Sequence, residues 1–129
     1  MEPSRFVIDS NIFVAFYSEG DSSHKDALDI LRELDQKTLV VHPYVIQEVS
    51  TVLAYKLGQY AAVQFLKDLE KSANTVIPVV DIRADIKNFS AEKKKISFTD
   101  AVLVALAKSM NAGLVTFDRQ MLASFKKFG

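Results

Sequence analysis

Four acidic residues stand at positions from which their carboxylates could act together, and we call them the acidic quartet: Asp9, Glu48, Asp100 and Asp118. Four carboxylates within a few ångströms repel one another, which raises some of their pKa values or requires a cation between them. No Arg or Lys nearby in the sequence supplies a consistent counter-charge for each acid. A hard divalent ion is therefore the simplest partner, and ligation by oxygen alone favours Mg²⁺ or Mn²⁺.

Three of the four acids also have a simpler structural explanation. Asp9 follows an apolar stretch and precedes a predicted helix that its carboxylate could cap, and Asp118 has the same kind of position. Ser97 and Asp100 have the spacing of a capping box at a helix start. Glu48 differs, because it lies in mid-helix at the edge of an apolar face, where an unpartnered charge is costly. A helix cap and a metal ligand both remain open for the first three acids.

The elements that must bring the quartet together are strands that alternate with helices. We expect strands at residues 5–8, 38–41, 75–80 and 114–117, and helices at residues 11–17, 24–34, 43–58, 59–71, 82–94, 99–110 and 119–125. The first strand is apolar without alternation, which suits a central position, whereas Pro78 favours a sheet edge for the third. This order predicts an α/β domain with a parallel sheet, in which ligand sites gather at the carboxyl ends of the strands.

Length and composition favour one compact domain over residues 1–129, with 49% hydrophobic residues and no Cys. Sixteen basic and sixteen acidic residues cancel, so only local clusters such as Lys93–Lys95 could attract a polyanion. The longest apolar run, Ala101–Ala107, is far shorter than the roughly 20 residues of a membrane span. No secretion signal opens the chain, and we expect a soluble, cytoplasmic protein. His24 and His42 show no ligand spacing and are interpreted as structural or surface residues.

The ordered motifs resemble those of PIN-domain ribonucleases, and among them the VapC toxins of VapBC-type toxin–antitoxin pairs in size and layout. These motifs are Asp9-Ser10-Asn11 after a strand, Glu48 in the third helix, Phe98-Thr99-Asp100-Ala101 at a helix start, and Val115-Thr116-Phe117-Asp118 at a later strand end. The resemblance covers nearly the whole chain. It implies a three-layer PIN-like fold with a central parallel sheet of four to five strands flanked by helices. The fifth strand, which often follows the last helix in this family, is missing or very short here.

The resemblance also implies an activity and the residues that carry it. The acidic quartet would gather Mg²⁺ or Mn²⁺ for hydrolysis of RNA phosphodiester bonds, leaving 5′-phosphate and 3′-hydroxyl ends. Asn11 and Thr116 would support the first and last acid, which leaves Ser10 to cap the helix. Candidates for contacts with flanking RNA phosphates are Lys93, Lys95 and Arg119.

For partners, the resemblance implies a homodimer and a small antitoxin protein that covers the acidic rim. The predicted helices over residues 43–69 carry more apolar residues than one core face needs, among them Tyr44, Tyr55, Tyr60 and Phe65. This surplus fits either an interface or a thick core.

Three other functions remain open. The domain could be a PIN-like module that binds RNA or protein without catalysis, or a nuclease of RNA maturation or decay without an antitoxin. A phosphotransfer domain with Asp9 as nucleophile is less well supported, because the haloacid-dehalogenase-like pattern needs a second acid where Asn11 stands. Metal-dependent RNA hydrolysis accounts for all four acids at once.

Overall fold

The computed structural model of the chain describes residues 2–128, in which four strands alternate with seven helices. The strands are β1 (Arg5–Ile8), β2 (Thr38–Val40), β3 (Thr75–Val76) and β4 (Gly113–Val115). The helices are α1 (Ser10–Tyr17), α2 (His24–Glu33), α3 (Pro43–Leu57), α4 (Gln59–Lys71), α5 (Ile82–Ser90), α6 (Phe98–Ser109) and α7 (Arg119–Phe128).

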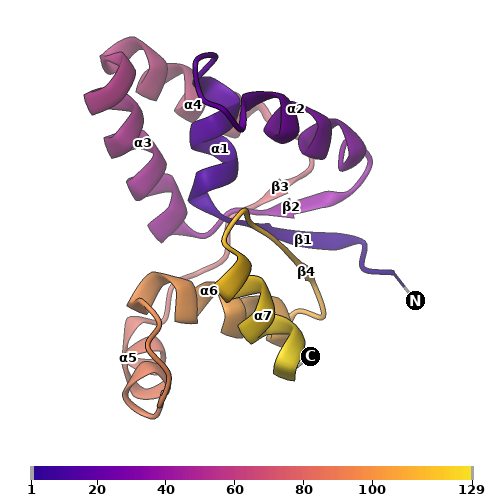
Figure 1. The fold of residues 1–129 in the computed structure, drawn as a ribbon, viewed down its shortest axis with the longest axis vertical. Coiled ribbons are helices and arrows are strands. Elements are labelled where there is room, and N and C mark those ends of the chain that lie inside the picture. Colours follow the sequence, from indigo (N-terminus) through magenta and orange to yellow (C-terminus); the bar gives the residue numbers. More distant parts are fainter. Residues whose placement is uncertain (1, 129) are drawn as a thin grey trace.

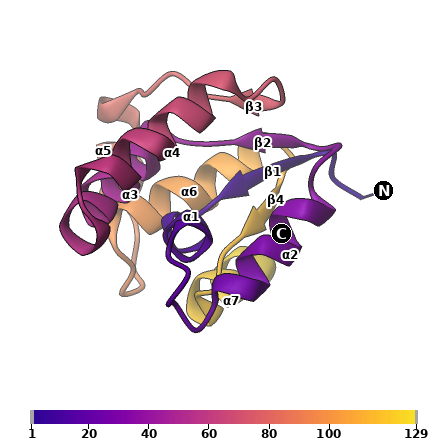
Figure 2. The same ribbon diagram turned by 90° about the horizontal axis from the view of Figure 1, so that it is seen from above.

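The strands form one parallel sheet in the order β3-β2-β1-β4, which Figure 2 shows from above. The apolar β1 lies between β2 and β4, as predicted, with Val7 opposite both Val40 and Leu114. Val7 and Ile8 are fully buried because helices cover both faces of the sheet. The strands are parallel, so the carboxyl ends of β1 and β4 lie together at one edge.

The helices form two layers, with α1–α4 on one face of the sheet and α5–α7 on the other (Figure 1). Between the sheet and the first layer lies an apolar core that includes Ile12, Phe13, Val45, Val49, Leu53 and Phe65. The core under the second layer includes Leu103, Val104, Ala107 and Met121. Helix α7 is the last element in residues 2–128 and extends to residue 128. None of the helices in residues 2–128 combines the length and apolarity that crossing a bilayer would take.

Two predicted elements are shorter than expected, while the others agree with the structure to within three residues. The third strand was predicted over residues 75–80, but only Thr75 and Val76 pair with β2. Pro78 has no N–H to donate, so the pairing stops there, and β3 is an edge strand as predicted. Helix α5 ends at Ser90 rather than near residue 94, because a Glu92 carboxylate oxygen accepts the backbone N–H groups of Lys93 and Lys94 and forms a turn.

His42 caps the helix that carries Glu48. Its ring is 3% exposed, and Nδ1 accepts the backbone N–H of Tyr44 at 2.9 Å, at the start of α3. Burial lowers the pKa of His42, and the nearby Asp85 carboxylate partly opposes this shift. Protonation of Nδ1 would remove the acceptor that caps the helix.

We therefore expect acid to weaken the fold through His42. The native imidazole has a pKa below 6.5, so the unfolded chain binds more protons beneath that pH and stability falls as pH decreases. Loss of one helix cap costs about 1 kcal/mol. Chemical unfolding of wild type and His42→Asn between pH 7 and 5 measures this cost, because Asn caps without titrating and all other groups cancel. Parallel stability curves for the two proteins would contradict the prediction.

Candidate functional site

Pairing of β1 with β4 brings Asp9 beside Thr116. The Asp9 backbone N–H donates to the Val115 carbonyl at 2.9 Å, which extends the ladder one residue past the end of β1. Both side chains are buried, with 5% of Asp9 and 8% of Thr116 exposed, and the Thr116 hydroxyl donates to Asp9 Oδ2 at 2.7 Å. A direct hydrogen bond thus joins Asp9 and Thr116, which are 107 residues apart in the sequence, at the carboxyl ends of β1 and β4.

The Thr116 hydroxyl makes three hydrogen bonds. Besides donating to Asp9, it accepts from the Asn11 side-chain amide at 3.1 Å and from the Asp118 backbone N–H at 3.0 Å. A hydroxyl has one donor and two acceptor positions, so its capacity is full. Asn11 Oδ1 in turn accepts the Phe117 N–H at 3.2 Å. This network, built from Asp9, Asn11, Thr116 and Asp118, holds α1 and the segment after β4 in one fixed arrangement.

Asp9 and Asp118 both cap helices, and this role leaves room for a second one. Asp9 Oδ1 accepts the Ser10 N–H at 2.7 Å at the start of α1, and Asp118 Oδ1 accepts the Met121 N–H at 3.1 Å in the first turn of α7. Each cap uses one carboxylate oxygen. Asp118 Oδ2 has no hydrogen-bond partner within residues 2–128. A carboxylate oxygen can also hold several lone-pair contacts, so capping and cation binding are compatible at these positions.

Glu48 lies nearer to solvent than its sequence position suggested. It borders the buried face of α3, as predicted, because Val45 and Val49 beside it are buried, but its own side chain is exposed. Its carboxylate nevertheless has a partner, since the Ser10 hydroxyl donates to Glu48 Oε1. The expectation that Ser10 caps α1 is wrong. Asp9 is the N-cap, and the Ser10 hydroxyl, 3.4 Å from Asp9 Oδ1, links the carboxylates of Asp9 and Glu48 instead.

Asp100 comes from α6, in the helix layer opposite to α3 with Glu48. Ser97 caps α6 by accepting the Asp100 N–H at 3.1 Å, which fixes the start of the helix. Burial raises the pKa of the Asp100 carboxyl, and the charges of Asp9, Asp118 and Glu48 raise it further. Burial also raises the pKa of Asp9, with a smaller contribution from Glu48, against hydrogen bonds from Thr116 and Ser10 that lower it. Asp100 therefore lies near enough to the other three acids for their charges to act on it, and Asp9 lies near Glu48.

The oxygen donors of the quartet match a hard divalent cation. Within residues 2–128, no three acidic or histidine side chains converge tightly enough to form a complete metal cage. Mg²⁺ does not need one, because it commonly keeps several waters and binds protein through one or two carboxylates. His42 and His24 have other roles, since His42 caps α3 and His24 Nδ1 lies 2.9 Å from the Ala15 carbonyl oxygen. The donor set of the quartet thus fits Mg²⁺ or Mn²⁺.

The basic candidates separate into two groups. Lys95 lines a surface cavity of about 570 Å³ together with Asp100 and Asp118. Lys93 and Arg119 are exposed and do not line it. Gln120 lines the same cavity and was not found in the sequence, where a lone Gln two residues after an acid carries no signal.

Comparisons with known proteins agree with this fold. The PIN domain family model matches residues 6–127. A VapC ribonuclease from Archaeoglobus fulgidus is 28% identical over 120 residues, covering 87% of this chain and 76% of the relative. The crystal structure of Mycobacterium tuberculosis VapC20, described as a sarcin-ricin loop cleaving toxin, superposes with a TM-score of 0.79 at 19% identity, covering 92% of this chain and 94% of that one. FitAcB from Neisseria gonorrhoeae gives a TM-score of 0.65 at 14% identity, with 94% and 93% covered. The expected three-layer PIN-like fold is confirmed.

Proposed function

Because the chain belongs to the PIN domain family, we propose that it is an Mg²⁺- or Mn²⁺-dependent endoribonuclease, the toxin of a type II toxin–antitoxin pair acting in the cytoplasm. The observation that carries this proposal is the gathering of carboxylates from separate elements at the carboxyl ends of the strands: Ser10 links Asp9 to Glu48, and Asp100 and Asp118 line one cavity. Folding has gathered charges that destabilise one another, which is expected where a cation is to be bound. Similarity to a VapC ribonuclease supports the choice of RNA as substrate.

The quartet would hold the metal, which supplies an activated water and charge neutralisation at the phosphate. Hydrogen bonds from neighbouring residues fix the orientation of the carboxylates that would bind this metal. Thr116 and the Ser10 N–H hold the two oxygens of Asp9, so this carboxylate has one orientation. The Ser10 hydroxyl links the Glu48 carboxylate to that of Asp9. The Met121 N–H, which Asp118 Oδ1 accepts, orients the Asp118 carboxylate. Such preorganisation lowers the cost of arranging ligands during hydrolysis.

The proposal is tested by incubating a single-stranded RNA with the protein in Mg²⁺, in Mn²⁺ and in EDTA. We expect cleavage with either metal, products with 5′-phosphate and 3′-hydroxyl ends, and no cleavage in EDTA. Cleavage that persists in EDTA, or products with 2′,3′-cyclic phosphate ends, would contradict metal-dependent hydrolysis.

A second candidate is a module that binds RNA or protein without catalysis. The helix caps formed by Asp9 and Asp118 and the lack of a complete three-ligand cage within residues 2–128 favour it. Calorimetric titration with Mn²⁺ separates the two functions. Binding that disappears in Asp9→Asn and Asp118→Asn supports the nuclease, whereas no binding by wild type supports the module. A nuclease of RNA maturation or decay would bind metal as well but have no antitoxin partner.

Protein partners are supported by exposed aromatic side chains on α3 and α4. Of the surplus apolar residues on these helices, Phe65 is in the core, whereas Tyr55 and Tyr60 are 89% and 82% exposed. Part of the surplus is thus available for a contact with another protein, such as a second copy or an antitoxin. We expect sedimentation velocity at micromolar concentration to give twice the 14.4 kDa mass of the chain. A monomer under these conditions would contradict the homodimer.

A further inference from the structure

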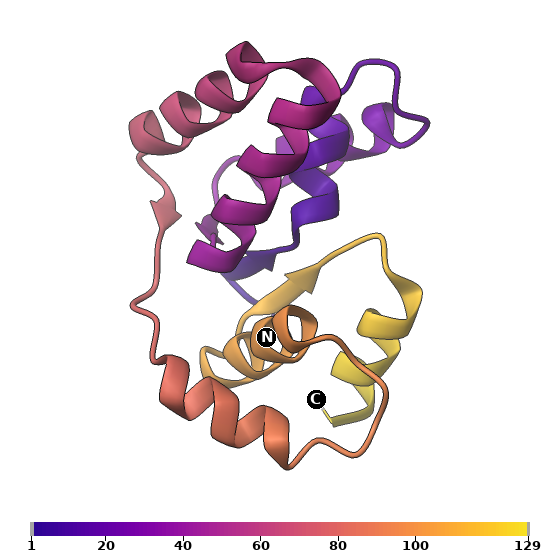
Figure 3. The ribbon, with the colours of Figure 1, turned by 90° about the vertical axis from the view of Figure 1, so that its left-hand side faces the viewer.

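A surface cavity of about 570 Å³ opens beside two members of the quartet. One side comes from the segment between α5 and α6, with Lys95 and Ile96, and from Asp100 in the first turn of α6. The other side comes from the start of α7, with Asp118, Gln120 and Met121. Figure 3 shows this segment running alongside α7 before it enters α6. The cavity is therefore continuous with the proposed site of hydrolysis.

The groups around the cavity differ in chemistry from one part to the next. Asp100 and Asp118 supply carboxylates, and Met121, 2% exposed, forms an apolar floor with the half-buried Ile96. Lys95 is exposed and forms no ion pair with any residue from 2 to 128. The exposed Gln120 amide likewise has no hydrogen-bond partner in this part of the chain. Two polar groups with unused capacity thus flank an apolar floor next to the acids.

This combination matches one nucleotide of a single strand. Sites for small ligands measure about 300–1,000 Å³, and this cavity lies within that range. The apolar floor fits the face of an unstacked base, the amide fits a base edge, and the ammonium fits a phosphate. The base edge must be free for such a contact, so the strand is unpaired at this position.

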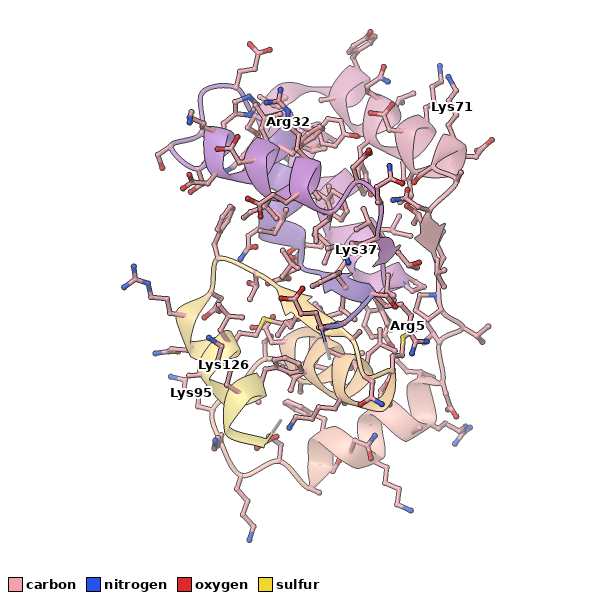
Figure 4. All side chains as sticks on the ribbon, turned by 90° about the vertical axis from the view of Figure 1, so that its right-hand side faces the viewer. Arg5, Arg32, Lys37, Lys71, Lys95 and Lys126 are labelled. Carbon is pink, nitrogen blue, oxygen red and sulfur yellow. The ribbon has the colours of Figure 1, made fainter. Side chains whose placement is uncertain are left out.

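Charge also limits where a phosphate can lie near the quartet. Asp100 and Asp118 repel phosphate unless a cation stands between them, and the net charge of the chain is zero, so no general attraction compensates. Among the lysines and arginines in the described chain, Lys95 is the one that lines the cavity with both acids and has no ion pair. Figure 4 shows Lys95 beside α7, with Lys71 at the opposite end of the molecule.

We infer that this cavity binds the nucleotide adjacent to the scissile phosphate, with Lys95 contacting its phosphate and Gln120 reading the edge of its base. The inference rests on the proposed ribonuclease function for the nature of the ligand. In this inference, Lys95 contributes to RNA affinity at any sequence, and Gln120 determines which base is preferred. Lys93 and Arg119, which lie outside the cavity, have no part in it.

The experiment measures binding without cleavage. Fluorescence anisotropy follows a labelled single-stranded RNA of ten nucleotides with Ca²⁺ in place of Mn²⁺, and a gel checks that the RNA stays intact. Lys95→Ala should weaken binding about tenfold for every sequence and reduce the slope of log affinity against log salt by about 0.7, the value for one phosphate on a single strand. Lys95→Arg should retain affinity, and Lys71→Ala is the control with the same change in charge.

Gln120→Ala tests base reading separately. Across RNAs that differ at one position, this variant should change relative affinities about fivefold or more and leave the salt slope unchanged. Any of three results would overturn the inference. These are a Lys95→Ala variant with the RNA affinity and salt slope of Lys71→Ala, a Gln120→Ala variant with the base preferences of wild type, and an absence of RNA binding by wild type.

Cleavage in Mn²⁺ is assayed in parallel, so that the two proposals can fail separately. If wild type does not cleave RNA but Lys95 and Gln120 have the effects above, the nuclease function is wrong and the nucleotide site stands. If wild type cleaves RNA and neither variant differs from Lys71→Ala, the nuclease stands and the site is wrong.

Discussion

Asp9→Asn should abolish metal-dependent RNA cleavage, with a loss greater than about a hundredfold. Residues one step removed from a metal typically cost 10–100-fold when changed, and Asp9 lies closer than that in the proposed site. The substitution preserves size and the acceptor for the Ser10 N–H, but it removes the charge and the acceptor for the Thr116 hydroxyl. Mn²⁺ binding measured by calorimetry should weaken together with cleavage.

The fold should survive this substitution. Burial raises the pKa of Asp9, which means that its charge already costs stability in the metal-free protein. Thermal unfolding of Asp9→Asn in EDTA should therefore occur near the wild-type temperature, because relief of the buried charge offsets the lost acceptor for the Thr116 hydroxyl. Asp26→Asn, at an exposed position on α2, is the matched control and should keep full activity. Wild-type cleavage rates in Asp9→Asn would show that this carboxylate is a helix cap and nothing more.

The arrangement of elements was predictable because its signals are local. The apolar, unalternating β1 identified a central strand, and Pro78 identified an edge. The third strand was predicted too long although the sequence carries the reason for its end, because Pro78 has no N–H with which to continue the pairing to β2. The end of α5 was missed since the turn at Glu92 is made by a side chain bonding to backbone, which hydrophobic spacing does not reveal.

Side-chain partnerships within the site were harder to predict than positions. Parallel pairing of β1 with β4 follows from the α/β pattern, so the meeting of Asp9 with the segment after β4 could be anticipated. The link from Ser10 to Glu48 could not, because it depends on how α1 packs against α3. The same holds for Gln120, which reaches the cavity only because the segment before α6 lies across from it.

Thr116→Val should reduce both Mn²⁺ affinity and RNA cleavage by about 10–100-fold, although Thr116 is not one of the four acidic residues. Valine keeps the shape but removes the hydroxyl that serves Asp9, Asn11 and Asp118 at once. Three buried or half-buried groups would lose a partner, so stability should fall by about 1–3 kcal/mol as well. Thr116→Ser restores the hydroxyl and should recover most of both losses.

The pH profile of cleavage separates this positioning role from a general loss of stability. The Thr116 hydrogen bond lowers the pKa of Asp9 and thereby opposes the effect of burial. Without that bond, the pKa of Asp9 rises further, and a higher pH is needed to ionise the carboxylate for metal binding. The acidic limb of the profile should therefore move to higher pH in Thr116→Val and return in Thr116→Ser. A valine variant that is merely less stable would show lower cleavage with an unmoved acidic limb, and that result would remove Thr116 from the proposed mechanism.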